Sequence, residues 1–89
     1  MTAKNEKIGY HTYAITKGKL GNISKIQEEL DELKDASNQE CKIMALVELA
    51  DMLGAIEAYM VVNLPGFTLN DLIKMKDITK RAFENGFRT

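Results

Sequence analysis

The chain has 89 residues, of which 45% are hydrophobic and 28% are charged, and its formal net charge is −1. This composition is too apolar for a disordered chain. Near-neutral charge also argues against a general binder of nucleic acids or anionic membranes, which would be basic. We expect one small domain spanning 1–89. Because Cys41 is the only cysteine, disulfides cannot stabilise it, and a reducing, cytoplasmic location is expected.

The sequence predicts neither a secretory signal nor a membrane span. No apolar run follows the N-terminal residues, as a signal peptide would require. The most apolar stretch, Ile43–Val62, contains Glu48, Asp51 and Glu57. Three carboxylates within such a span argue against a helix that faces lipid.

Residues 1–22 are expected to form an N-terminal arm that ends in a glycine-containing turn. Tyr, Thr and Ile are frequent in 7–16 and partly alternate, which indicates a short strand or an extended arm. Ser24 and Gln27 then match a capping box. They predict a first helix over 24–37, with an apolar stripe along one side.

The second predicted helix runs from 39 or 40 to 62 and is apolar on nearly every side. Such a helix must be buried on every side, and two other helices of a short chain cannot surround it. We therefore expect a homodimer or homotetramer. Thr68 and Asp71 predict the start of a third helix, within a basic segment over 67–86. The fold class is thus all-α: an antiparallel bundle of three helices plus the arm, completed by oligomerisation.

Two pairs of carboxylates carry the chemical signal. Glu29 and Glu32 lie three residues apart on the first helix, and Glu48 and Asp51 on the second, so each pair shares a helix face. A short connection favours antiparallel packing, which lets the two pairs face each other across 23–62. Four such carboxylates would repel one another unless a cation neutralised them. All-oxygen ligands suit Mg²⁺, with Mn²⁺ as an alternative.

Other interpretations of these residues remain open. The acidic residues of the first helix could form a solvated face, and Glu48 and Asp51 could pair with Lys or Arg. His11 is the only histidine, which excludes metal clusters built from several histidines. We expect it on an ordinary strand or arm, with a nucleotide contact as the less favoured alternative.

The carboxylate pattern resembles a known family. Glu28-Glu29-x-x-Glu32 followed by Glu48-x-x-Asp51 is similar to the signature of the MazG-like all-α nucleoside triphosphate pyrophosphohydrolases. The resemblance covers about 23–62 and extends weakly to Arg81-x-x-x-Asn85-x-x-Arg88. The amino-acid sequence of these segments also resembles that of small bacteriophage-encoded members, for which the location would be the host cytoplasm.

The resemblance implies hydrolysis of a nucleotide between its α- and β-phosphates, giving a nucleoside monophosphate and pyrophosphate. It implies that Mg²⁺ is held by Glu29, Glu32, Glu48 and Asp51. Glu28 matches the first motif position and would orient water or a second ion, so all five carboxylates are candidate catalytic residues. Candidate contacts to the phosphates are basic or amide side chains: Lys25, Lys80, Arg81, Asn85 and Arg88.

The distribution of charge agrees with a small nucleotide as the partner. Residues 28–57 hold nine acidic and two basic side chains, whereas the remainder holds ten basic and four acidic ones. An acidic two-helix cleft beside basic segments would hold a metal ion and phosphate, with no nucleic acid or membrane partner. Two alternatives remain: a non-catalytic nucleotide-binding or interaction module on the same scaffold, and a purely structural helical adaptor.

Overall fold

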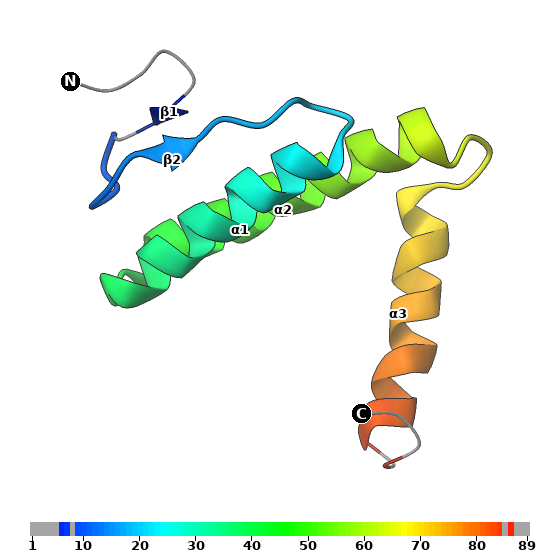
Figure 1. Cartoon of the computed structure of the whole chain (residues 1–89). Coiled ribbons are helices and arrows are strands. Elements are labelled where there is room, and N and C mark those ends of the chain that lie inside the picture. The colour runs from blue at the N-terminus through cyan, green and yellow to red at the C-terminus, as the bar shows by residue number, and fades with distance from the viewer. Residues whose placement is uncertain (1–5, 8, 85, 87–89) are drawn as a thin grey trace.

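The chain is mostly helical, as predicted. A computed structural model describes residues 6, 7, 9–84 and 86, and Figure 1 traces its elements in order. Two short strands, β1 (Glu6–Lys7) and β2 (Ile15–Thr16), precede three helices: α1 (Ile23–Asn38), α2 (Lys42–Asn63) and α3 (Leu69–Glu84). The predicted helix bounds are correct to within about three residues.

Helices α1 and α2 form an antiparallel hairpin and lie side by side along their lengths (Figure 1). The connection is short because Glu40 adopts a positive φ of 55°, which reverses the chain within three residues. The predicted capping box at Ser24 is wrong. The helix begins one residue earlier, after Asn22, and the Ser24 hydroxyl accepts a hydrogen bond from the Lys19 N–H at 3.0 Å.

The N-terminal segment folds back on itself instead of forming one strand over 7–16. β1 and β2 pair antiparallel, with Lys7 opposite Ile15, and the chain turns between them. The Ile15 side chain is buried and β2 contacts α1. The turn between the strands is thereby held against the helical hairpin.

The interior between α1 and α2 is unusually polar. Among the described residues, the buried apolar side chains are Ile15, Ala36, Ala55 and Met60, and the buried polar ones are His11, Glu28, Glu29, Glu32, Asp35 and Glu48. Burying carboxylates costs free energy unless hydrogen bonds or opposite charge compensate. The hairpin therefore holds a concentration of negative charge that a simple structural core would avoid.

Helix α3 does not join this hairpin into a three-helix bundle within the chain; it projects away from the end of α2 (Figure 1). Thr68 and Asp71 cap its start as predicted: the Thr68 N–H donates to Asp71 at 2.9 Å, and the Asp71 N–H donates to the Thr68 hydroxyl at 3.3 Å. Redirection of the chain takes place in the preceding turn, where Gly66 has a φ of 93°, a conformation that glycine adopts readily.

Because α3 projects away, much of α2 stays uncovered. Ile43 is 77% exposed, Leu46 69% and Val61 71%. The chain alone therefore does not bury α2 on every side. No helix in the described part of the chain has an apolar stretch sufficient to cross a membrane.

Candidate metal centre

Four carboxylates converge between α1 and α2. Glu29 and Glu32 come from α1, and Glu48 and Asp51 come from α2. Each offers one oxygen, and these four oxygens lie within 4.8 Å of one another. The spacing of three residues on each helix places each pair on one face, and the antiparallel hairpin turns the two faces toward each other. The predicted ligand set is therefore brought together.

The environment of the cluster disfavours its negative charge. Glu48 is fully buried and Glu32 is 1% exposed, whereas Asp51 lies at the exposed edge. Burial, together with the neighbouring Glu32, raises the pKa of Glu48 to about 7, even though Tyr10 and His11 act in the opposite direction. Burial and Glu32 likewise raise the pKa of Glu29, although Lys25 partly offsets them.

The donor set fits a hard divalent cation. Within the part of the chain that the structure describes, the buried Oε2 atoms of Glu29 and Glu48 have no hydrogen-bond partner. Mg²⁺ and Mn²⁺ prefer carboxylate oxygens. A cation between the helices would satisfy these oxygens and offset the repulsion among the carboxylates.

Glu28 and Lys25 lie beside the cluster. Glu28 is not among the four converging carboxylates: it accepts hydrogen bonds from the Gly18 N–H at 2.7 Å and from Lys25 Nζ at 3.1 Å. It therefore holds the loop before α1. A side chain at Gly18 would meet the Ser24 carbonyl oxygen at 2.1 Å, so this approach requires glycine. Lys25 also pairs with Glu29 at 3.2 Å.

A pocket adjoins the cluster on this side. Its volume is about 460 Å³, within the range of roughly 300–1,000 Å³ that is typical for small-molecule sites. Charged and apolar groups share its lining, which consists of Leu20, Lys25, Glu29, Ala50, Asp51, Gly54 and Ala55. It thus places one cation, Lys25, next to two of the clustered carboxylates.

Two of the remaining predicted phosphate contacts, Lys80 and Arg81, lie on a helix that points away from the cluster of the same chain (Figure 1). On this helix, α3, Lys80 is 3.8 Å from Glu84. Local helix periodicity places Lys80 and Arg81 on α3 but says nothing about where α3 points. Asn85 and Arg88 lie outside the described residues.

The structure adds residues that sequence reasoning missed, all from the turn of the N-terminal arm or the end of α1. The Tyr10 hydroxyl donates to Glu48. That hydrogen bond, together with burial and the nearby carboxylates, raises the pKa of Tyr10 to about 12. Asp35 accepts hydrogen bonds from the backbone N–H and the hydroxyl of Thr12 and from Gln39 Nε2. The Oδ2 atom of Asp35 also lies 2.8 Å from His11 Nδ1.

Asp35 anchors the arm as an ionised group. Burial acts to raise its pKa, but the hydrogen bonds from Thr12, His11 and Gln39 outweigh burial and lower it to about 2. Its position seven residues after Glu28 and three after Glu32 continues the same helix face. That spacing was the available signal for its burial.

One of the simpler interpretations is wrong. Glu28, Glu29 and Glu32 are buried, so they do not belong to a solvated face. His11 lies on the arm, one of the two expected places, but it is buried in the turn between β1 and β2 and faces Glu32 and Glu48.

No family model, curated protein or solved structure matches the chain. The feature that bears on function is the convergence of buried carboxylates beside a pocket that contains a lysine.

In the absence of divalent cations, we expect the protein to become less stable as the pH rises from about 4.5 to about 7. The folded state binds the Glu48 proton more tightly than the unfolded chain does, because the pKa of Glu48 rises from 4.5 to about 7 on folding. Stability must then fall as that proton is lost. Asp35, with its pKa lowered from 3.8 to about 2, acts only below this window.

Thermal unfolding in EDTA across this pH window measures the effect. The Glu48→Gln variant is the control and should show a flatter pH dependence. A wild-type melting temperature that rises with pH through this window would contradict the raised pKa of Glu48.

Proposed function

We propose that the chain is a Mg²⁺-dependent nucleotide pyrophosphohydrolase of MazG-like type. It would cleave a (d)NTP or a related nucleotide between the α- and β-phosphates, releasing a nucleoside monophosphate and pyrophosphate. The observation that carries the proposal is the convergence of Glu29, Glu32, Glu48 and Asp51 from two helices. Their sequence spacing resembles that of the MazG-like family.

The residues have distinct parts in this proposal. The four carboxylates would hold Mg²⁺ or Mn²⁺, which supplies charge neutralisation at the phosphates and lowers the pKa of a bound water. Lys25 lines the adjoining pocket and would bind phosphate oxygens. Its pKa is raised by hydrogen bonds to Glu28 and Glu29 in spite of burial, so it stays cationic. A carboxylate of the cluster would accept the proton of the attacking water.

The test is product analysis with the purified full chain. A panel of NTPs and dNTPs is incubated with Mg²⁺ or Mn²⁺, and pyrophosphate and orthophosphate are measured separately. Pyrophosphate with an equal amount of nucleoside monophosphate supports the proposal, whereas orthophosphate alone indicates cleavage at another phosphate and contradicts it. Nucleotide binding without turnover supports the alternative of a non-catalytic nucleotide-binding module. If the chain shows no nucleotide binding and no turnover, the result supports the alternative of a structural adaptor.

The proposal includes a second copy of the chain, as a homodimer or homotetramer. The exposed apolar residues of α2, among them Ile43 and Leu46, favour association because burying apolar surface is stabilising. Lys80 and Arg81 lie toward the C-terminal end of α3, and this helix projects away from the hairpin (Figure 1). If they bind phosphates, α3 of a neighbouring copy has to deliver them.

We expect analytical ultracentrifugation at micromolar concentration to give a mass of at least twice the 10.0 kDa of one chain. Leu46→Asp should shift the distribution toward monomer, because it places a charge on the exposed apolar side of α2. Asn38→Asp introduces the same charge at an exposed position that ends α1 and should leave the mass unchanged. A wild-type monomer contradicts the expectation.

A further inference from the structure

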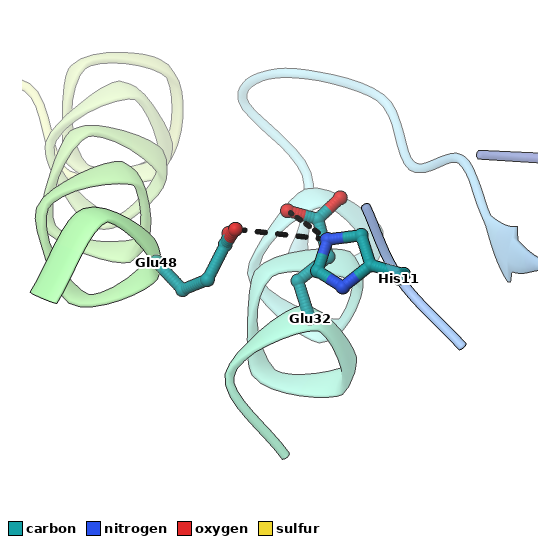
Figure 2. Close-up of side chains that lie close together, drawn as sticks. All are labelled: His11, Glu32 and Glu48. Carbon is teal, nitrogen blue, oxygen red and sulfur yellow. Dashed lines mark ion pairs between the residues drawn. The ribbon is translucent and has the colours of Figure 1, made fainter. Parts of the chain in front are cut away.

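His11 lies beside the carboxylate cluster, not apart from it. Its Nε2 atom is 3.6 Å from Glu48 Oε1 and 3.8 Å from Glu32 Oε2. Figure 2 shows the imidazole from the arm meeting one carboxylate from α1 and one from α2, with the same ring nitrogen directed at both. One ligand atom from each of the three residues lies within 4.8 Å of the ligand atoms of the other two.

These separations suit ligands of one metal ion better than direct hydrogen bonds. A hydrogen bond between nitrogen and oxygen has a heavy-atom distance of about 2.7–3.2 Å, and both contacts of Nε2 exceed it. Ligands bound at about 2.0–2.2 Å from a common metal ion lie roughly 3–3.6 Å apart. Small side-chain adjustments would bring all three groups onto one ion.

Asp35 orients the His11 ring for metal binding. Its carboxylate accepts three other hydrogen bonds and lies 2.8 Å from His11 Nδ1. An ionised carboxylate only accepts, so the proton of a neutral ring is on Nδ1 and the lone pair of Nε2 faces Glu32 and Glu48. A carboxylate that orients a histidine in this way is the usual outer partner of a metal-bound imidazole.

We propose that His11 Nε2, Glu32 and Glu48 bind a divalent transition-metal ion, such as Zn²⁺ or Mn²⁺, next to the all-oxygen position. Imidazole nitrogen favours transition metals, whereas Mg²⁺ favours oxygen. The buried Oε2 atom of Glu48, without a hydrogen-bond partner among the described residues, gives this carboxylate an oxygen for a second ion. The inference rests on the proposed function only in sharing Glu32 and Glu48, and it does not require nucleotide hydrolysis.

The single histidine makes the test direct. The full chain is prepared without a polyhistidine tag and labelled with ¹⁵N, so that one imidazole gives the ring-nitrogen signals. Zn²⁺ alone is then titrated at neutral pH. We expect the Nε2 resonance to shift on binding while Nδ1 keeps its proton. Ring nitrogens that do not respond when Zn²⁺ is saturating, or a ring that retains both protons, would overturn the proposal.

Variants separate this position from the all-oxygen one. Asp35→Asn should weaken Zn²⁺ binding by about 10–100-fold in calorimetry, the range for lost outer partners of metal ligands. His11→Gln, which removes a direct ligand, should weaken Zn²⁺ binding at least as much, and both variants should change Mg²⁺ binding little. Circular dichroism of both variants establishes that the hairpin is folded. Asp51→Asn, which alters only the all-oxygen set, should leave the His11 response to Zn²⁺ intact. If folded His11→Gln loses affinity for Zn²⁺ and for Mg²⁺ equally, His11 has a general structural role, and this result would contradict its assignment as a Zn²⁺ ligand.

If nucleotide turnover is absent but His11 responds to Zn²⁺, the proposed function fails and this metal site stands. If pyrophosphate is released with Mg²⁺ and His11 does not respond to Zn²⁺, the proposed function stands and this site fails.

Discussion

Glu48→Gln is expected to lower the rate of pyrophosphate release by about 10²–10³-fold while it makes the metal-free protein more stable. The loss of rate follows because a bound cation contributes several kcal/mol to charge stabilisation, and each 1.36 kcal/mol is about tenfold in rate. Glu48 belongs both to the four-oxygen set and to the group that includes His11. No other side chain of α2 has this double position among the described residues.

The gain in stability has a separate cause. The pKa of Glu48 is raised to about 7, chiefly by burial and by Glu32, so its charge is unfavourable in the folded state above that pH. Glutamine removes the charge, keeps an oxygen that can accept from the Tyr10 hydroxyl, and adds an N–H₂ group that can donate to Glu32. We expect the melting temperature in EDTA at alkaline pH to rise by several degrees.

Glu57→Gln is the matched control, since Glu57 is exposed on the same helix outside the carboxylate cluster. It should change neither rate nor melting temperature. Full activity of Glu48→Gln would contradict the proposed role of the cluster in the reaction. A loss of stability in that variant would contradict the view that Glu48 is strained by its environment.

Saturating Mg²⁺ or Mn²⁺ is expected to raise the melting temperature by ~10–20 °C. A ligand that binds only the folded state at 100 times its Kd contributes about 2.7 kcal/mol, and each kcal/mol shifts a domain of this size by about 4–8 °C. The carboxylates that would supply this binding are brought together only by the hairpin of α1 and α2. The unfolded chain has no such arrangement, so the linkage favours the folded state.

Scanning calorimetry with and without the cation measures the shift, at constant protein concentration and with NaCl adjusted to equal ionic strength. The double variant Glu29→Gln/Glu48→Gln should lose most of the shift, because it neutralises one ligand on each helix. A similar shift from NaCl alone would indicate general screening of negative charge and would contradict a specific site.

Most of the helical content and the two carboxylate pairs were predictable from the sequence. The positions of α1 and α3 follow from apolar periodicity and from local signals such as the Thr68–Asp71 cap, and that of α2 follows from its long apolar run. The four clustered carboxylates were predictable for the same reason, since helix geometry alone puts residues three apart on one face. A short connection between two helices then leaves an antiparallel hairpin as the simplest arrangement.

The contribution of the N-terminal arm was decided by tertiary structure. His11 is 24 residues from Asp35, and Tyr10 is 38 residues from Glu48. No periodicity connects positions so far apart, and the mixed polarity of the arm does not predict which helix face it covers. Helix spacing places Asp35 on the buried face, but only the tertiary structure brings Thr12 beside it.

Tertiary structure also separated residues that the sequence pattern had grouped. Glu28 adjoins Glu29 in the motif, yet it binds the loop at Gly18, because consecutive helix residues point in different directions. Lys80 and Arg81 are basic residues of the expected kind, but the turn at Gly66 sends α3 away from the cluster. By itself, the sequence determined which side chains share a helix face, since that is local geometry; only long-range packing decided which faces, loops and charges meet.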